Sequence, residues 1–550
     1  MQKTCTVTGK QFEVSQKEME LRKKMKIEGE PSTHPMVRMR HLMAFWQHWN
    51  LYRRKCDRTG KQIISVFSEE CPYPVWHKDE WMKHANPPLA DVNLSAPVIP
   101  QMWELFKQCP IAHNIGAGCE NCEYTDDWWF SKNCYLSHSG FETEDLSYCY
   151  RVVHCKNCQF CVFSFDSERC IDLINCHNCN EVRYAFNSNN CSDSAFLYDC
   201  RNCTHCLFCF NLRNKRFCIG NKQLTKEEYE KQAAELNMQS RTEYLAAKDT
   251  FNQMLRSQAW HRALFIDRSE DSTGNHMDEC KGMVNSFFAT NGAEDCVNCI
   301  RGAKEVKDCL DIVSPLRVQL GYCSVLTQEQ CYEVKFCYNI SQCNRVEYLA
   351  HCVQCEDCFA CCGLKGKKYH IFNKPYSQEE YEILRTKIIQ AMKDHGEYGA
   401  FFPGYFAANS YADSLAATYW KLTPEETLRA GFRVENQTTA RSSNVKDAAE
   451  VPDNSADATD AVTKEVFWDA EAGRQFQILA QDIAFAKSIG APLPYNFYSH
   501  RLQENFSNIY FNGELRTTAC GKCQAEIKTG WPAQFDGRIL CEQCYLVQVY

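Results

Sequence analysis

The chain carries one cysteine run twice: residues 200–209 read CRNCTHCLFC, and residues 352–361 read CVQCEDCFAC. Residues 200–230 align without a gap with residues 352–382, and 13 of these 31 positions are identical. After the two copies, Thr225 with Glu228 and Ser377 with Glu380 show the hydroxyl–glutamate spacing of a helix capping box. The repeat therefore predicts two Cys-rich blocks, each followed by a helix.

The cysteines of the first block follow a period of three. From Cys119 to Cys218 there are 16 cysteines, and every interval between them is a multiple of three. A helix repeats every 3.6 residues and a strand every 2, so neither element alone produces this spacing. Cys149, Cys170 and Cys191 also recur every 21 residues. We therefore predict a β-solenoid whose coils of about 21 residues stack on one another.

The 37 cysteines in 550 residues suit three kinds of chemistry. Most are expected to pack as buried free thiols, because no apolar signal segment follows Met1 and a reducing cytoplasm is the default compartment. Isolated metal sites within the cysteine ladders are the second possibility. The third is an iron–sulfur cluster or zinc at the two cysteine runs, although the last gap is two residues and Phe210 and Cys362 stand where ferredoxins have proline. The candidate ligands of the runs are Cys200, Cys203, Cys206, Cys209, Cys352, Cys355, Cys358 and Cys361.

The strongest metal motif lies at the C-terminus. Two C-x2-C pairs, Cys520 with Cys523 and Cys541 with Cys544, are separated by 17 residues. Four thiolates at this spacing are typical of a structural zinc ribbon. A closed shell of four sulfurs leaves no open position for water, so this zinc is expected to stabilise folding without catalysis.

A second repeat joins the two ends of the chain at an offset of 464. Gly9 and Phe12 align with Gly473 and Phe476, and the set Cys56, Thr59, His77 and Glu80 aligns with the four C-terminal cysteines. Threonine is a poor zinc ligand, so a metal-free ribbon-like module is expected at the N-terminus. The alternative is a zinc site with Cys56 and His77 as ligands, supplemented by Cys71 or His84.

Basic residues gather at three places. Residues 1–61 hold 14 Lys and Arg against 6 Asp and Glu, although the whole chain has a formal net charge of −8. Such clusters either contact RNA or a partner, or lie on packed elements and solvated turns. The candidate residues are Arg53, Arg54 and Lys55, followed by Arg213, Lys215, Arg216, Lys365, Lys367 and Lys368.

These patterns predict a mainly β fold, with a two-block Cys-rich β-solenoid, capping helices and flanking paired zinc-ribbon-like α+β modules. The predicted boundaries are 1–90 for the degenerate ribbon-like module, 91–118 for a connector with a short helix, 119–224 for solenoid block 1, 225–262 for a helical segment, 263–376 for solenoid block 2, 377–435 for a helix and connector, 436–463 for a flexible linker, and 464–550 for the zinc-ribbon module.

Several stretches resemble a known family in combination. They are Cys5 with Gly9 and Phe12, residues 51–57, residues 73–75, the cysteine runs leading to residues 371–374, and residues 540–550. Together they resemble an uncharacterised family of Cys-rich zinc-ribbon proteins of small-genome candidate-phyla bacteria, over nearly the whole chain. The resemblance implies zinc ribbons and no activity. Family members carry cysteine where this chain has Thr8, His34, Thr59, His77, Glu80 and Trp468.

The sequence favours a non-enzymatic function. It contains no phosphate-binding loop, dinucleotide fingerprint, zinc-protease helix or nucleophile elbow, and no catalytic residue is proposed. No apolar stretch is long enough to span a membrane, and no small-molecule substrate is indicated. We expect a zinc-binding scaffold for a protein or ribonucleoprotein partner. The alternative is a redox or metal-handling protein that uses the cysteine ladders or iron–sulfur clusters.

Overall fold

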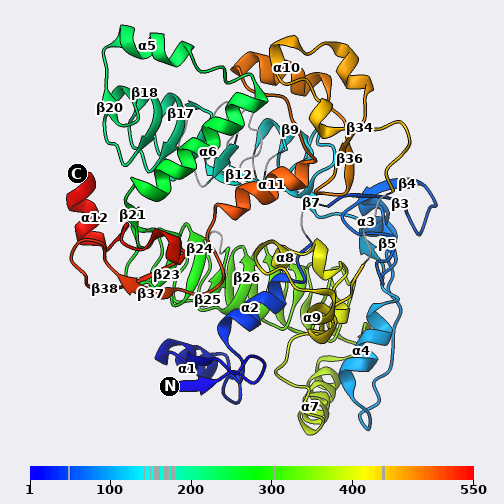
Figure 1. The fold of residues 1–550 in the computed structure, drawn as a ribbon. Helices are drawn as coiled ribbons and strands as arrows, with labels where there is room; N and C mark the ends of the chain where they lie inside the picture. The colour runs from blue at the N-terminus through cyan, green and yellow to red at the C-terminus, as the bar shows by residue number, and fades with distance from the viewer. Residues whose placement is uncertain are drawn as a thin grey trace. The chain divides into compact units, whose positions relative to one another are not determined.

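The computed structural model describes residues 1–47, 50–141, 143–148, 150–153, 162–165, 172–174, 180–301, 305–435 and 440–550. These residues form a mixed fold of many strands and 12 α-helices, so the mainly β prediction holds only in part (Figure 1). The chain divides into two compact units. Unit 1 comprises Met1–Asn114, Leu264–Glu435 and Phe511–Leu515, and unit 2 comprises Ile115–Ala263, Asn436–Tyr510 and Arg516–Tyr550.

Unit 1 contains a 12-stranded sheet in which neighbouring strands run parallel, apart from the last pair. Gly274 pairs with Ser286 and Asn344 with Glu356, so the chain returns to the same register after 12 residues. Val297 pairs with Leu310, which shows an insertion of one residue. The strands are β22 (Ile266–Asp267), β23 (Gly274–Asp278), β24 (Ser286–Thr290), β25 (Val297–Ile300), β26 (Leu310–Pro315), β27 (Val318–Gln328), β28 (Cys331–Lys335), β29 (Tyr338–Ser341), β30 (Asn344–Glu347), β31 (Glu356–Phe359), β32 (Lys368–Ile371) and β33 (Lys374–Pro375).

Unit 2 contains a second 12-stranded sheet with the same register. Ser192 pairs with Thr204, and Thr204 pairs with Arg216, again 12 residues apart. The strands are β7 (Gly116–Ala117), β8 (Asp126–Trp129), β10 (His138–Phe141), β12 (Tyr150–Val153), β13 (Val162–Phe165), β14 (Asp172–Ile174), β15 (Asn180–Val182), β16 (Tyr184–Phe186), β17 (Ser192–Tyr198), β18 (Thr204–Phe210), β19 (Arg216–Ile219) and β20 (Lys222–Gln223). Strands β9 (Lys132–Tyr135) and β11 (Glu144–Ser147) pair separately and in parallel.

A left-handed residue at every third position explains the cysteine spacing. Asn202, His205 and Phe208 have φ values of 53°, 52° and 52°, and each directly precedes a fully buried cysteine. A positive φ is uncommon outside glycine, so its regular recurrence bends the chain after every three residues. Each third side chain therefore points into the core.

The predicted 21-residue coil is wrong, because the parallel register repeats every 12 residues. Every multiple of three keeps the buried positions in phase, so the cysteine intervals alone did not distinguish 12 from 21. Of the three cysteines that suggested 21, Cys149 and Cys170 lie outside the described residues.

Sulfur makes up much of the core of each sheet. The described cysteines are free thiols, and most are buried. In unit 1 they alternate with Val, Ile, Leu and Met, and in unit 2 they pack with Trp128, Ala185 and Leu197. The prediction that most thiols pack as core therefore agrees with their burial. The buried sulfurs of these two cores belong to Cys134, Cys191, Cys200, Cys203, Cys206, Cys209 and Cys218 in unit 2, and to Cys280, Cys296, Cys299, Cys309, Cys331, Cys337, Cys343, Cys352, Cys355, Cys358 and Cys361 in unit 1.

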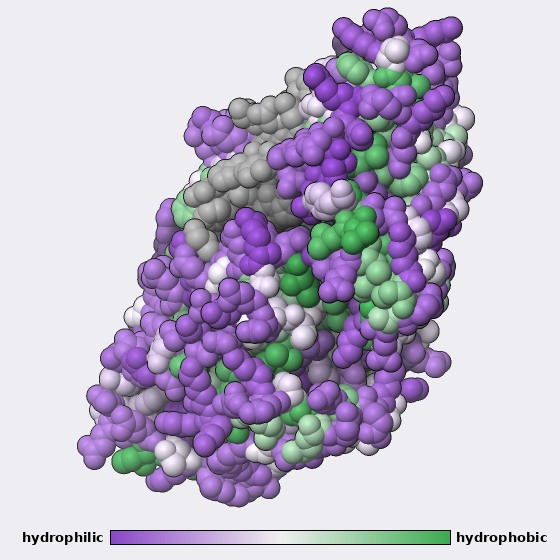
Figure 2. Space-filling model, turned by 90° about the vertical axis from the view of Figure 1, so that its left-hand side faces the viewer, coloured by the Kyte–Doolittle hydropathy of each residue, from purple (hydrophilic) through white to green (hydrophobic). Residues whose placement is uncertain are grey.

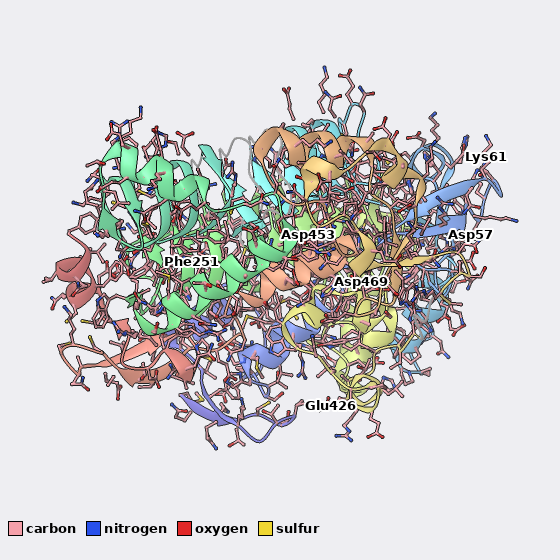
Figure 3. The ribbon with its side chains drawn as sticks, turned by 45° about the horizontal axis from the view of Figure 1, so that its top comes forward. Asp57, Lys61, Phe251, Glu426, Asp453 and Asp469 are labelled. Atoms are coloured by element: carbon pink, nitrogen blue, oxygen red, sulfur yellow. The ribbon has the colours of Figure 1, made fainter. Side chains whose placement is uncertain are left out.

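The two predicted capping boxes are confirmed. Thr225 and Glu228 start α5 (Lys226–Ala234), and Ser377 and Glu380 start α7 (Gln378–Asp394) with reciprocal hydrogen bonds. In unit 2, α6 (Arg241–Ser257) follows α5, packs on β17 and buries Phe251, which Figure 3 labels. The remaining helices are α1 (Gln16–Lys24), α2 (Pro35–Met43), α3 (Lys78–His84), α4 (Val98–Phe106), α8 (Leu415–Tyr419) and α9 (Pro424–Arg429) in unit 1, and α10 (Ala480–Ile489), α11 (Tyr498–Ser507) and α12 (Glu542–Val549) in unit 2.

Short hairpins complete the units. In unit 1 these are β1 (Gln2–Thr4) with β2 (Gln11–Glu13) and β3 (Tyr52–Lys55) with β4 (Gln62–Ser65), while β5 (Val75–Trp76) pairs with β6 (Ile111–Ala112). In unit 2, β34 (Lys446–Asp447), β35 (Phe467–Asp469) and β36 (Arg474–Phe476) form one sheet, β37 (Arg516–Ala519) pairs with β38 (Glu526–Thr529), and β21 (His261–Arg262) pairs with β39 (Ile539–Leu540).

The predicted linker, 436–463, takes part in a core. Residues 436–439 lie outside the described part of the chain, but Val451, Ala458 and Val462 are buried together with Phe467 of β35. Within the described residues, no helix has the length and apolar character needed to cross a membrane. On the face in Figure 2, hydrophobic side chains form small groups among hydrophilic ones.

Candidate metal centre

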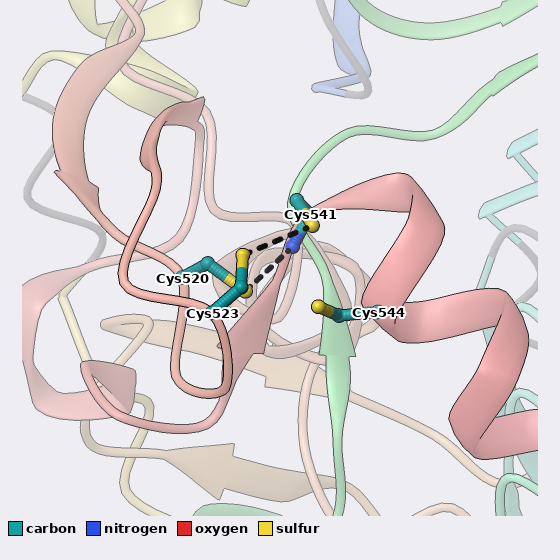
Figure 4. A group of neighbouring side chains, drawn as sticks. All are labelled: Cys520, Cys523, Cys541 and Cys544. Atoms are coloured by element: carbon teal, nitrogen blue, oxygen red, sulfur yellow. Dashed lines mark hydrogen bonds between the residues drawn. The ribbon is translucent and has the colours of Figure 1, made fainter.

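Four cysteine sulfurs converge in the C-terminal module of unit 2 (Figure 4). The sulfurs of Cys520, Cys523, Cys541 and Cys544 all lie within 4.8 Å of one another. The Sγ atoms of Cys523 and Cys541 are 3.7 Å apart. A tetrahedral ion with metal–sulfur bonds of about 2.3 Å needs sulfurs about 3.8 Å apart, so the four thiols fit a bound metal ion.

Two local structures bring these sulfurs together. Cys520 follows β37, and the turn back to β38 is closed by a 2.8 Å hydrogen bond from the Cys520 N–H to the Ala525 carbonyl. Gln524 completes this turn with a φ of 61°. Cys541 follows β39 and is the N-cap of α12, so Cys544 lies in the first turn of that helix.

Backbone N–H groups favour a thiolate at Cys520. Burial raises the pKa of Cys520, but N–H groups of Cys541, Cys523 and Lys522 donate to its sulfur and lower the pKa to about 6. The Cys541 N–H lies 3.3 Å from this sulfur. Hydrogen bonds that stabilise the charged form of a ligand also prepare it for a cation.

The module is attached to the rest of unit 2 by side chains near the sulfurs. The Tyr545 hydroxyl of α12 donates to Asp199, and Arg213 donates to Tyr545 at 3.1 Å. Glu542 accepts hydrogen bonds from Arg262 at 2.6 and 3.0 Å. A metal that orders Cys541 and Cys544 would therefore also hold α12 against the 12-stranded sheet.

The predicted N-terminal site has the same backbone but a different ligand set. Cys56 follows β3, and the His77 N–H donates to its sulfur at 3.3 Å, as the Cys541 N–H does to Cys520. His77 is the N-cap of α3 and its ring stacks on His113. Glu80 forms an ion pair with Arg58. Of the two substitute ligands, Cys71 is fully buried with its pKa raised to about 12 by burial, and His84 lies 3.9 Å from Glu80.

Two further copies of this turn were missed by the sequence argument. Cys5 follows β1, the Cys5 N–H donates to the Lys10 carbonyl at 2.8 Å, and His34 is the N-cap of α2. Burial raises the pKa of Cys5, but the Thr8 hydroxyl and the N–H groups of His34, Thr8 and Val7 lower it to about 7. This thiol has no cysteine partner in its turn, because Thr8 stands at the position of Cys523.

The fourth copy has a carboxylate in place of the first sulfur. Asp469, labelled in Figure 3, ends β35 and accepts hydrogen bonds from the N–H groups of Glu471 and Ala472 at 3.0 Å and of Phe497 at 2.8 Å. The His500 ring nitrogen lies 2.9 Å from it. The offset of 464 maps Cys5 onto Asp469, so the aligned glycines Gly9 and Gly473 were the signal that could have revealed this pair.

The carboxylate of Asp469 is expected to stabilise its turn. Replacing it by asparagine, the change Asp469→Asn, removes an acceptor and places an N–H2 group against N–H donors, at a cost of about 2–3 kcal/mol. The pKa of Asp469 is lowered because its hydrogen bonds outweigh burial. The stabilisation is therefore complete above about pH 4 and is lost as pH falls further. Hydrogen exchange of α11 measures the opening free energy.

Glu471→Gln is the matched control for this prediction. Glu471 also contacts the His500 ring, at 3.2 Å, but its side chain is 81% exposed. Its replacement is expected to change the opening free energy of α11 by less than about 0.5 kcal/mol. Equal effects of the two substitutions would contradict the structural role given to Asp469.

The cysteine runs occupy the cores of the two sheets. All eight cysteines of the runs are at most 1% exposed. Among the described residues, the C-terminal set is the one group that brings three or more ligand atoms within 4.8 Å of one another. The runs therefore do not form a preassembled tetrahedral site in the described part of the chain.

Several of the predicted basic residues form internal contacts. Arg54 is buried and pairs with Asp57 at 2.9 Å, and Arg213 pairs with Asp199 at 3.2 Å. Lys365 donates to the Met82 carbonyl at 2.8 Å, and Lys368 to Glu356 at 2.9 Å. The side chains of Arg53, Lys55, Lys215, Arg216 and Lys367 are exposed.

The arrangement supports metal binding by protein sulfur alone. Four thiols complete a tetrahedral shell, and the neighbouring side chains contact protein groups. No protein-family model, curated protein or solved structure matches the chain.

Proposed function

We propose that the chain is a non-enzymatic scaffold, stabilised by one zinc ion at its C-terminal module, that recognises a protein partner. The convergence of four sulfurs from two C-x2-C pairs is the observation that carries this proposal. Zinc favours such a set, and four protein ligands leave no position for a reacting water. The many free thiols suit a reducing compartment, so we place the protein in the cytoplasm.

The scaffold itself is proposed to be a pair of β-solenoids, one in each unit. Three features support this. Each unit has a 12-stranded sheet, parallel strands pair at intervals of 12 residues, and left-handed residues recur every three positions. A coil of four three-residue sides accounts for all three. Solenoids expose long lateral surfaces, which suits recognition of another protein.

A protein partner is favoured over RNA because much of the positive charge is already paired inside unit 1. Lys17 contacts Asp295, Lys24 lies 2.6 Å from Asp308, and Arg38 lies 3.2 Å from Asp311. The N-terminal excess of Lys and Arg thus faces acidic residues of the adjoining sheet. This leaves less positive charge for phosphates.

RNA binding is expected to be weak. Fluorescence anisotropy with a labelled single-stranded RNA should give a dissociation constant above about 10 µM at physiological salt, as for non-specific contacts. The variant Arg53→Ala/Lys55→Ala, which removes exposed charges, should change it little. Submicromolar binding that weakens steeply with salt and is lost in this variant would favour a ribonucleoprotein partner instead.

Zinc is tested by elemental analysis of protein purified without chelator. About one zinc per chain is expected, because only the C-terminal turn keeps four sulfurs. Cobalt substitution should give the visible absorption of a tetrahedral tetrathiolate. A chain that retains no metal, with the four cysteines reduced, would contradict the proposal.

A further inference from the structure

One cysteine in each core is surrounded by three others. In unit 2 the sulfur of Cys203 accepts hydrogen bonds from the thiols of Cys191, Cys200 and Cys206. In unit 1 the sulfur of Cys355 accepts them from the thiols of Cys343, Cys352 and Cys358. We refer to these two groups as the sulfur clusters.

The two sulfur clusters are equivalent. Adding 152, the offset of the sequence repeat, converts each cysteine of the first into one of the second. In both, the central sulfur also accepts a backbone N–H, from Lys215 in one and Lys367 in the other. The same arrangement therefore occurs twice in independently folded surroundings, which a chance contact would not explain.

The central sulfur and one neighbour lie on adjacent strands. Cys191 and Cys203 directly precede the paired residues Ser192 and Thr204, and Cys343 and Cys355 precede the pair Asn344 and Glu356. Adjacent strands are about 4.8 Å apart. Two metal–sulfur bonds of about 2.3 Å end to end span about 4.6 Å. A linear sulfur–metal–sulfur unit therefore fits the strand spacing without movement of the backbone.

We infer that each sulfur cluster binds one Cu(I) ion, held between Cys203 and Cys191 in unit 2 and between Cys355 and Cys343 in unit 1. Thiolates are the ligands that select Cu(I), and a filled-shell monovalent ion accepts two sulfurs in a line. Zinc is unsuited, because it needs four sulfurs close to one another, and among the described residues only Cys520, Cys523, Cys541 and Cys544 provide them.

The exchange conserves charge in the core. Three S–H donors on each central sulfur favour its thiolate form, so a cluster holds three protons on four sulfurs. When Cu(I) binds, it forms bonds to the central thiolate and to the sulfur of Cys191 or Cys343, whose proton is released to solvent. One positive charge replaces another, and copper is neither oxidised nor reduced. Burial therefore opposes this exchange much less than it opposes adding a charge.

The test is a competition for Cu(I) between zinc-loaded, reduced protein and the coloured chelator bathocuproine disulfonate, under anaerobic conditions. Incubation must be long enough for local opening, because the sulfurs are buried. The wild-type chain should withdraw about two Cu(I) ions per chain from the chelator. Elemental analysis should show that zinc is retained, which separates this uptake from binding at the C-terminal site.

The decisive variant is Cys203→Val/Cys355→Val, and the control is Cys299→Val/Cys337→Val. Valine already occupies such buried positions, since Val318 pairs with Cys331 and Val346 pairs with Cys358. The first variant should lose the two Cu(I) ions, and the control should keep them. If the first does not fold, Cys191→Val/Cys343→Val removes the second ligand and should have the same effect.

Three results would overturn the inference. They are no withdrawal of Cu(I) by the wild-type chain, equal withdrawal by the decisive and control variants, or withdrawal matched by loss of zinc. The last would place copper at the C-terminal cysteines and leave the zinc scaffold proposal to be judged by its own metal analysis.

Discussion

Replacing Cys541 and Cys544 by serine is expected to abolish metal binding and to unfold the C-terminal module locally. The two sulfurs belong to α12 and its N-cap, and α12 carries the Tyr545 contact to Asp199. Structural zinc sites contribute on the order of 10 kcal/mol at neutral pH. Apart from the sulfurs, the module buries only a small cluster around Leu540 and Tyr545, so without the metal little apolar burial remains to hold it.

Hydrogen exchange followed by mass spectrometry measures this effect. Amides of α12 and of the hairpin β37–β38 should exchange at least about 100-fold faster in the variant, while those of β17 and β18 keep their protection. The matched control is Cys119→Ser/Cys122→Ser, which has the same spacing in the same unit. Cys119 is exposed and Cys122 is half-buried. A variant that loses its metal but keeps the protection of α12 would contradict a structural role for the ion.

Arg38→Met is expected to destabilise unit 1 by about 3–5 kcal/mol. The Arg38 guanidinium lies 2.9 Å from Glu18 of α1 and 3.2 Å from Asp311 of β26, and both carboxylates are nearly fully buried. The two carboxylates raise the pKa of Arg38 against the effect of burial, so the arginine stays charged. Methionine keeps the apolar part of the side chain but leaves both acids without this cation.

Lys10→Met separates the buried network from ordinary surface pairing. Lys10 contacts Glu514 at 3.3 Å, and its side chain is 55% exposed. Loss of that ion pair should cost less than about 1 kcal/mol. Hydrogen exchange of α1, α2 and β26 measures both variants. If Arg38→Met and Lys10→Met have the same small effect, the N-terminal charge is not committed to unit 1, and the argument against an RNA partner loses its support.

The sequence contained the local rules of the fold but not its register. The three-residue spacing of the cysteines identified the buried positions, and Thr225 and Ser377 identified the starts of α5 and α7. The length of the repeat was not determined by the cysteines, because 12 and 21 are both multiples of three. It is set by strand pairing, which joins Ser192 to Thr204. Such pairing depends on contacts between segments that composition does not specify.

The candidate metal site was the part most accessible to prediction. Two C-x2-C pairs are local motifs, so their convergence at Cys520 and Cys541 followed from spacing. Asp469 was not recognised, because a carboxylate that replaces a thiol is visible only through its hydrogen bonds to Phe497 and His500. The internal pairing of Arg38 with Asp311 was also invisible, since 273 positions separate the two residues in the sequence.

Elemental analysis for zinc and iron, on protein purified without oxygen or chelators, tests the central claim most directly. That claim is that the cysteines are mainly structural, with one tetrathiolate metal site per chain. It predicts about one zinc per chain, no iron, and complete loss of the zinc in the Cys541→Ser/Cys544→Ser variant. Several iron atoms per chain with visible charge-transfer absorption, or zinc that persists in this variant, would contradict it.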